Sequence, residues 1–240
     1  MPMTQQSIQV WVARVAEFSA EEWRPVLSET EWGRAMRFRM PADQARFAVT
    51  RGILRTLLGR HLSMPAAAIQ FTANEFGKPA IVPSQNAESL QFNVSHSGDY
   101  ALLAVAHGVD VGVDVERIGA SRVVRDLAQR VLSPGEYQRF MVLPEHDRET
   151  TFFQIWTLKE SVLKGIGSGL SVAPEQIEVT FHPHEPRLLS CSTAQIPDVS
   201  EWTLRSLSIR DNGYKAAIAI RNKMPSIGIN EFDVAQMYDK

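Results

Sequence analysis

Residues 111–116, VGVDVE, constrain the fold more than any other part of this 240-residue chain. The alternation of valines with other residues predicts a β-strand with one buried face, because successive side chains of a strand point to opposite sides. The other face carries Gly112, Asp114 and Glu116, and we expect the glycine to leave room beside the carboxylates. Two neighbouring carboxylates repel each other unless a cation lies between them. Taken alone, the segment is explained more simply as a half-exposed strand with a solvated acidic face.

A second segment, residues 156–164 (WTLKESVLK), changes that interpretation. At about 100° per residue, a helix here turns Leu158 and Val162 toward a core and leaves Glu160 and Lys164 away from it. A Glu and a Lys four residues apart often form a simple surface pair. The tryptophan one turn earlier and the glycine-rich stretch that follows favour a binding site instead, because glycines allow a sharp turn and leave space for a ligand. Three carboxylates and a lysine on regular structure suit a hard cation held against a phosphate.

Hydrophobic patterning predicts helices in the first third of the chain, strands in the middle and strands again at the end. The expected helices span residues 29–39, 41–62, 122–132 and 149–165. The expected strands span residues 91–95, 100–106, 111–116, 177–181, 202–208 and 215–220. Short glycine-containing turns separate the first three strands, which predicts an antiparallel meander. Because the first and third strands of a meander end at the same edge, Ser95 and His96 are expected near Asp114 and Glu116.

Charge and cysteine content exclude several classes of protein. The net charge of −2 argues against general nucleic-acid binding, which usually shows a strong basic excess. The single cysteine, Cys191, excludes an internal disulfide and fits a reducing compartment. We see no secretion signal and no apolar run of about 18 residues, the length that spans a bilayer, so a cytoplasmic protein without a membrane partner is expected. The length allows two halves, residues 1–110 and 111–240.

Other residues have the chemistry of phosphate ligands. Residues 77–79 (GKP) place the ammonium group of Lys78 at a rigid turn, which suits a phosphate oxygen, although so short a motif is frequent by chance. Beside a phosphate, His96 would be a cationic donor and Ser95 a neutral one. A histidine near carboxylates is more often a structural residue, which is the simpler alternative here.

In their order along the chain, these motifs resemble those of the 4′-phosphopantetheinyl transferases, specifically the larger Sfp-type branch. The matching segments are residues 77–79 (GKP), 92–97 (FNVSHS), 112–116 (GVDVE) and 156–164 (WTLKESVLK). The resemblance implies an α+β fold of two similar halves related by a pseudo-twofold, each a small antiparallel sheet packed with helices. It also implies a monomer that transfers the 4′-phosphopantetheine moiety of coenzyme A to a serine hydroxyl of apo acyl or peptidyl carrier proteins, releasing adenosine 3′,5′-bisphosphate.

The resemblance further implies roles for individual residues. Asp114, Glu116 and Glu160 would hold Mg²⁺, with Mn²⁺ as an alternative. Glu160, Lys164 and His96 would be the catalytic groups, and Glu160 is the candidate to accept the proton of the serine, directly or through a metal-bound water. One carboxylate is not easily both a tight metal ligand and a free base, so the role of Glu160 stays open between ligand, base and both. The residues expected to bind coenzyme A are Arg34, Arg46, Lys78, Pro79, Ser95, His96, Asp114 and Lys164.

Two other functions use the same residues. A magnesium-dependent hydrolase that cleaves a nucleotide pyrophosphate would need the carboxylates but no protein acceptor. A non-catalytic module that binds coenzyme A or a nucleotide is the third hypothesis, although a pure binder gains little from three acids. For the transferase, the arginines of the expected helix 122–132 could attract an acidic carrier protein by long-range electrostatics. They are Arg122, Arg125 and Arg130.

Overall fold

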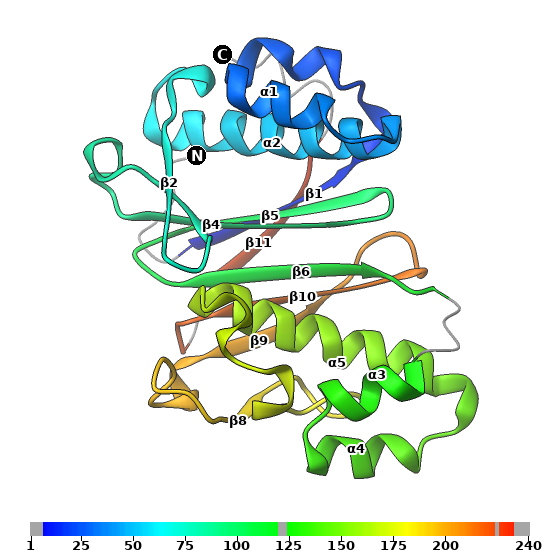
Figure 1. Cartoon of the computed structure of the whole chain (residues 1–240). Helices are drawn as coiled ribbons and strands as arrows, with labels where there is room; N and C mark the ends of the chain where they lie inside the picture. The colour runs from blue at the N-terminus through cyan, green and yellow to red at the C-terminus, as the bar shows by residue number, and fades with distance from the viewer. Residues whose placement is uncertain (1–6, 120–123, 224–225, 233–240) are drawn as a thin grey trace.

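The computed structural model describes residues 7–119, 124–223 and 226–232. Two sheets lie face to face in the middle of the molecule, and helices cover the outer side of each (Figure 1). The predicted α+β class is therefore confirmed. Within the described residues, no helix is both long and apolar enough to cross a bilayer.

Five α-helices and eleven strands make up the described part of the chain, together with short 3₁₀ turns. The helices are α1 (Glu29–Met36), α2 (Pro41–Leu62), α3 (Val124–Val131), α4 (Pro134–Met141) and α5 (Glu145–Ile166). The strands are β1 (Ser7–Arg14), β2 (Phe71–Ala73), β3 (Pro79–Ile81), β4 (Leu90–Ser97), β5 (Tyr100–His107), β6 (Val111–Arg117), β7 (Ile177–Val179), β8 (Leu188–Cys191), β9 (Thr203–Leu207), β10 (Tyr214–Ile220) and β11 (Ser226–Glu231).

The predicted meander of β4, β5 and β6 is confirmed for the antiparallel pair of β4 and β5 but wrong for β6. The first sheet has the order β11-β1-β5-β4, whereas β6 belongs to a second sheet of order β6-β10-β9. Strand β5 already has β1 on one side and β4 on the other, so β6 has no free edge of β5 with which to pair. The alternating valines of β6 instead point into the apolar layer between the two sheets. The sequence-based interpretation failed here because it assigned only helices to the first third of the chain and missed β1.

The two halves repeat the same arrangement of elements. In each, one strand is followed by short helical segments, the last of which is a short α-helix, then by a 22-residue helix, a small hairpin and two further strands. The three longer strands form the order β1-β5-β4 or β6-β10-β9. The short helices α1 and α4 both begin with a capping box, whose glutamates are Glu31 and Glu136. Glu31 pairs with Arg55 and Glu136 with Lys159, and both cations are the fifteenth residue of their long helix. The geometry is repeated although the sequence shows no internal repeat.

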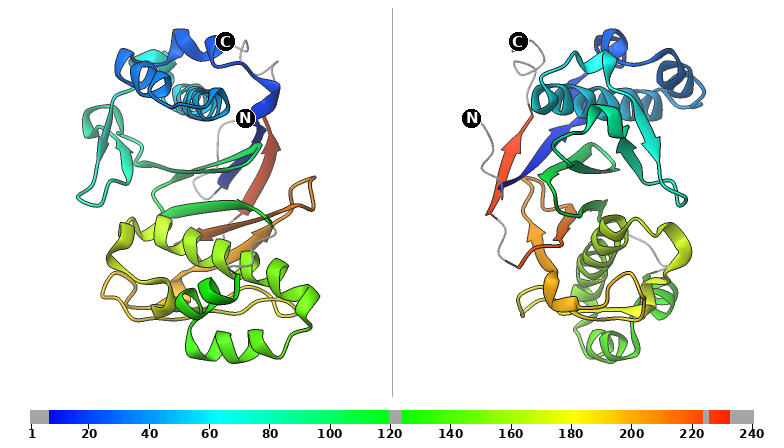
Figure 2. Two further views of the ribbon diagram at one scale, coloured as in Figure 1. Left: turned by 45° about the vertical axis from the view of Figure 1, so that its right-hand side comes forward. Right: turned by 90° about the vertical axis from the view of Figure 1, so that its left-hand side faces the viewer.

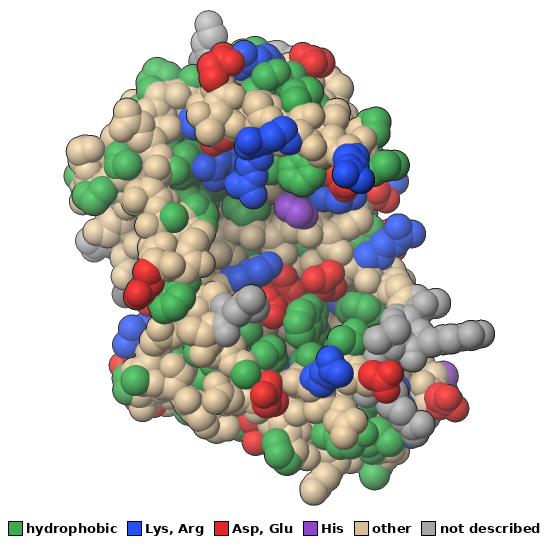
Figure 3. All heavy atoms as spheres, viewed as in Figure 1, with side chains coloured by type: hydrophobic (Ala, Val, Ile, Leu, Met, Phe, Trp, Pro, Cys, Tyr) green, Lys and Arg blue, Asp and Glu red, His purple; other side chains and the backbone are tan. Residues whose placement is uncertain are grey.

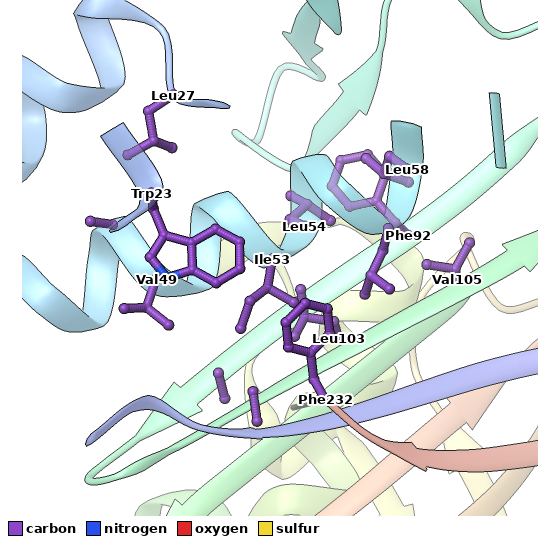
Figure 4. Packing of buried hydrophobic residues seen from close by; sticks show 14 of the residues in the cluster. Trp23, Leu27, Val49, Ile53, Leu54, Leu58, Phe92, Leu103, Val105 and Phe232 are labelled. Atoms are coloured by element: carbon purple, nitrogen blue, oxygen red, sulfur yellow. The ribbon is translucent and has the colours of Figure 1, made fainter. Parts of the chain in front are cut away.

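The core of the first half lies between α2 and the first sheet (Figure 4). An apolar stripe on α2 packs there toward Trp23 and the inner face of β5, and all of its members except the partly buried Phe47 are fully buried. Gly52 allows this contact, because a Cβ atom at this position would lie 2.1 Å from the Trp23 ring. The buried members of the stripe are Ile53, Leu54, Leu57 and Leu58.

The last described strand, β11, returns to the first half of the molecule. It pairs in parallel with β1 and lies beside it in both views of Figure 2. Phe232, directly after β11, is buried against the rings of Trp11, Phe18 and Trp23. The edge of β1 is thus covered by a segment that follows the second half in the sequence. The division into residues 1–110 and 111–240 stays a prediction.

Candidate functional site

Helix α5 lies directly on the carboxylate face of β6. A Cβ atom at Gly112 would lie 2.0 Å from the carbonyl oxygen of Ser161 and 2.3 Å from the amide nitrogen of Gly165. The glycine is needed because backbone of the helix occupies the space beside it, not because a ligand does. This close approach brings the polar face of α5, with Glu160 and Lys164, to the acids of β6.

Asp114 is the most buried of the predicted acids, with 2% of its surface exposed. Its Oδ1 accepts hydrogen bonds from Lys164 Nζ at 2.6 Å and from Ser95 Oγ at 2.9 Å. Its Oδ2 is buried and has no partner within the described residues. Burial raises the pKa of Asp114 to about 6, against the opposing effect of Lys164 and with a further increase from Glu116. The structure therefore brings Ser95, Asp114 and Lys164 into direct contact.

Side chains of β4 hold β6 in place, although the two strands form no backbone ladder. Asn93, Ser95 and Ser97 are alternate residues of β4, and each accepts a hydrogen bond from a backbone N–H of β6 at 3.0, 3.2 and 3.1 Å, respectively. These bonds satisfy the N–H groups on the outer edge of β6, which would otherwise lack partners. The donors are the N–H groups of Val113, Val115 and Arg117.

The two serines of this contact also bind the two acids. Ser95 Oγ donates to Asp114, and Ser97 Oγ donates to Glu116 Oε2 at 2.8 Å. Each hydroxyl thus accepts from the backbone of β6 and donates to a carboxylate of the same strand. Ser97 was not among the predicted site residues. The signal that could have found it is its spacing of two from Ser95, which matches the spacing of the acids.

Glu160 lies in the same electrostatic environment as the acids of β6. Partial burial raises its pKa, and the negative charges of Asp114 and Glu116 raise it further, while Lys164 opposes them. Within the part of the chain that the structure describes, no set of three or more His, Cys, Asp or Glu side chains is arranged to hold a metal ion. The three-carboxylate metal site therefore stays a prediction.

The remaining predicted ligands lie on the first half. His96 is exposed, and its pKa is lowered by partial desolvation and by the nearby cations Arg46 and Lys164. Arg46 donates to the carbonyl of Gly98 at 3.0 Å and to Asp43 at 2.6 Å. The guanidinium of Arg34, on α1, lies over the Phe47 ring at 5.1 Å. Acidic and basic side chains gather around the hollow between the two halves (Figure 3).

A cavity of about 370 Å³ opens beside Glu160 and Lys164. Trp156 and Glu160 both line it, as their spacing of one helical turn predicts. Most of its other lining is apolar and comes from both halves of the chain. Those residues include Phe76, Pro79, Val94, Leu163, Val172 and Pro174.

Known proteins similar in sequence to this chain identify its family. Residues 110–219 match the family model of the 4′-phosphopantetheinyl transferase superfamily, and residues 10–108 match the N-terminal domain of 4′-phosphopantetheinyl transferase. The 4′-phosphopantetheinyl transferase HetI of Nostoc sp. is 36% identical over 85% of this chain and 82% of its own length. The chain belongs to the 4′-phosphopantetheinyl transferase superfamily. Its activity is the transfer of 4′-phosphopantetheine to carrier proteins, as the motifs predict.

Two further proteins match this chain at lower identity. The 4′-phosphopantetheinyl transferase Sfp of Bacillus subtilis is 26% identical over 82% of this chain and 84% of its own length, which agrees with the predicted Sfp-type branch. This chain also matches the crystal structure of Helicobacter pylori holo-[acyl-carrier-protein] synthase in complex with coenzyme A. The match covers 45% of this chain and 96% of the synthase chain, with 20% identity and a TM-score of 0.36.

Lys159, in the same helical motif of this transferase, is buried in the core and does not line the cavity. Its ammonium group is fully buried, contacts Glu136 at 2.6 Å and donates to the carbonyls of Val131 and Pro174 at 2.8 and 2.9 Å. The lysine thus faces the core while the adjacent Glu160 faces the cavity. One helical motif of the transferase both anchors α5 and supplies the site.

Proposed function

We propose that this transferase moves the 4′-phosphopantetheine arm of coenzyme A to a serine of an apo acyl or peptidyl carrier protein with the help of Mg²⁺. The observation that supports this most strongly is the contact of Lys164 and Ser95 with the buried Asp114, beside the cavity that Glu160 lines. Fatty-acid, polyketide and peptide synthesis are the pathways whose carriers fit this chemistry. We further propose that the protein acts as a cytoplasmic monomer.

The acids of the site suit a divalent cation. Asp114 Oδ2 is buried without a partner, and Asp114, Glu116 and Glu160 repel one another, so a cation would relieve both costs. We therefore assign these three carboxylates to Mg²⁺, with Mn²⁺ as the alternative. The metal would neutralise charge that develops on the pyrophosphate of coenzyme A.

The protein groups would carry out the remaining steps. The serine oxygen of the carrier attacks the phosphorus that bears the pantetheine arm, and the bond from that phosphorus to the bridging oxygen of adenosine 3′,5′-bisphosphate breaks. Glu160 accepts the serine proton, for which its raised pKa is suited. Lys164, His96 and Ser95 donate hydrogen bonds or positive charge to the phosphate oxygens.

The other predicted ligands would hold the ends of coenzyme A. Arg34 and Arg46 would bind the adenosine 3′-phosphate, and Lys78 and Pro79 would lie along the pyrophosphate. The apolar cavity beside Glu160 suits the uncharged pantetheine arm. Helix α3 would meet the carrier protein through Arg130, which is exposed, and Leu127, which is 41% exposed. Of the other predicted arginines, Arg122 and the side chain of Arg125 lie outside the described residues.

The function is tested by incubating the protein with coenzyme A, Mg²⁺ and an apo carrier protein and measuring the mass of the carrier. We expect a gain of one phosphopantetheine, no gain when the acceptor serine of the carrier is alanine, and no gain in EDTA. Consumption of coenzyme A without a carrier would support the hydrolase instead. Binding of coenzyme A that is unaffected by Mg²⁺, without turnover, would support the non-catalytic module.

Removing the hydroxyl of Ser97 is expected to slow transfer without unfolding the protein. Ser97→Ala frees the carboxylate of Glu116, and the loss of such an outer contact of a metal ligand typically costs about 10- to 100-fold in metal affinity or activity. The initial rate of the carrier mass shift, measured across a series of Mg²⁺ concentrations, should fall and need more Mg²⁺. Ser190→Ala, at an exposed position of β8, is the matched control. Equal rates for both variants would contradict a role for Ser97 in holding Glu116.

A further inference from the structure

A turn of the first half contacts the end of the catalytic helix of the second half. This turn, residues 74–78, joins β2 to β3. Its shape is fixed internally, because Asn74 Oδ1 accepts hydrogen bonds from the N–H groups of Phe76 at 3.0 Å and Lys78 at 2.8 Å. The backbone of Asn74 also donates to the carbonyl of Lys78 at 3.0 Å. The turn can therefore present its remaining polar atoms in one geometry.

Two of those atoms reach α5. Asn74 Nδ2 donates to the carbonyl of Gly167 at 2.9 Å, and Lys78 Nζ donates to the carbonyl of Gly165 at 2.6 Å. The last carbonyl groups of a helix have no partner within it and form the negative end of its dipole. An amide donor and an ammonium group are the two kinds of side chain that satisfy these carbonyls.

The glycines after α5 accommodate the turn. A Cβ atom at Gly167 would lie 2.6 Å from Cδ of Lys78, and one at Gly169 would lie 3.3 Å from Cβ of Phe76. Gly167 also has a positive φ of 68°, which ends the helix. Both glycines line the cavity beside Glu160, in keeping with the predicted space for a ligand, and they also leave room for Lys78 and Phe76 of the other half.

The ammonium group of Lys78 is not a solvent-exposed group waiting to bind a phosphate. Its side chain is half-buried, and burial lowers the pKa of its ammonium group while Asp110 opposes this change. The ammonium group is already engaged by the carbonyl of Gly165. Direct contact of Lys78 with coenzyme A stays a prediction, but its contact with α5 needs no ligand.

We propose that Asn74 and Lys78 are positioning residues, which cap α5 from the opposite half and so fix Glu160 and Lys164 relative to the cleft. Lys164 directly precedes the capped Gly165, and Glu160 lies one helical turn earlier. The turn thus connects the two halves through hydrogen bonds at the point where the catalytic helix ends. The effect on transfer rests on the proposed function, whereas the cap itself does not.

Asn74→Asp tests the cap with a minimal change. The aspartate keeps an oxygen that can hold the turn but replaces the Nδ2 donor with an oxygen facing the carbonyl of Gly167. Asn86→Asp is the matched control, because Asn86 holds its own turn in the same way. Asn86 Oδ1 accepts from the N–H of Leu90 at 2.7 Å, and Nδ2 donates to the carbonyl of the same residue at 3.0 Å. All of these bonds stay within the first half.

Amide hydrogen exchange, measured without coenzyme A, tests whether the turn caps α5 independently of activity. We expect Asn74→Asp and Lys78→Met to accelerate amide exchange at the end of α5, residues 160–167, by about fivefold to tenfold, as loss of one hydrogen bond predicts. Asn86→Asp should leave these amides unchanged. Equal exchange in Asn74→Asp and Asn86→Asp would overturn the proposal. If the wild-type protein shows no transfer, the proposed function is wrong. The exchange rates of Asn74→Asp and Asn86→Asp still show whether the turn caps α5.

Transfer kinetics distinguish positioning from direct binding. For Asn74→Asp we expect kcat to fall about fivefold to tenfold, the equivalent of one hydrogen bond, with the KM for coenzyme A changed less than about twofold. Asn86→Asp should keep both values. A raised KM with unchanged kcat would show that the turn binds coenzyme A instead of positioning α5, and would overturn the proposal.

Discussion

Asp114→Asn is expected to abolish phosphopantetheine transfer and, in the absence of divalent cations, to stabilise the fold. The substitution keeps the shape of the side chain but removes the charge that contacts Lys164 and, in the proposed function, Mg²⁺. Loss of such a ligand should lower the transfer rate by about 10²- to 10³-fold, the effect typical of removing one stabilising group from an active site. Few single changes in this protein should separate activity from stability so clearly.

The gain in stability follows from burial of the charge. The folded pKa of Asp114, about 6, is above its ordinary value of 3.8. A group with a raised folded pKa contributes stability below its unfolded pKa and loses it as the pH rises through the folded pKa. At pH 7 the ionised carboxyl therefore costs about 3 kcal/mol, and Asp114→Asn should recover about 1–3 kcal/mol.

Urea unfolding and the carrier mass shift measure the two effects. The stability difference between wild type and Asp114→Asn should be present at pH 7 and disappear near pH 4, where Asp114 is protonated in the folded protein. Mg²⁺ should stabilise the wild type and have no such effect on the variant. Asp147→Ala, at the exposed start of α5, is the control for loss of an acid. Substantial turnover by Asp114→Asn would remove this residue from the proposed metal site.

Glu136→Ala should cause the largest loss of stability of the changes considered. Glu136 and Lys159 are both fully buried, and their charged groups lie 2.6 Å apart. Glu136 also accepts hydrogen bonds from the N–H groups of Ser133 at 2.8 Å and Val179 at 2.7 Å. Burial lowers the pKa of Lys159, and Glu136 opposes this change. Without Glu136 the ammonium group stays buried without its partner, which typically costs about 3–5 kcal/mol.

The matched control for this change is an ion pair at the surface. Glu178→Ala breaks the contact of Glu178 with Arg139, whose side chains are 27% and 46% exposed, and should cost about 0–1 kcal/mol. The free energy of unfolding in urea compares the two variants. A loss below about 1 kcal/mol in Glu136→Ala would show that the buried pair does not anchor α5.

Local patterns predicted several elements closely. Helix α2 spans the predicted residues 41–62, because Pro41 suits the first turn of a helix and the apolar stripe continues to the end. Other local signals were present but were not used. Ile8, Val10 and Val12 alternate along β1, and Ser133 with Glu136 forms the capping box that begins α4. Both missed elements were therefore within reach of the rules that identified α2.

The proximity of Ser95 to Asp114 was predicted correctly, although the predicted sheet topology was wrong. The meander would have placed the ends of β4 and β6 at one edge of a single sheet. In the structure, the two strands belong to different sheets and meet through the side chains of Asn93, Ser95 and Ser97. No periodicity of one strand reveals such a contact, because it depends on which strands already occupy the neighbouring edges.

The family, and the residues on which the proposed chemistry depends, could be identified from the amino-acid sequence alone. The identity and spacing of Asp114, Glu116, Glu160 and Lys164 are local properties, since a strand repeats every second residue and a helix every 3.6. Their neighbours come from distant parts of the chain: α5 lies against Gly112, β10 pairs with β6, and the turn of residues 74–78 contacts the end of α5. Contacts between distant segments depend on the burial and hydrogen bonding of the whole chain, which no local pattern contains.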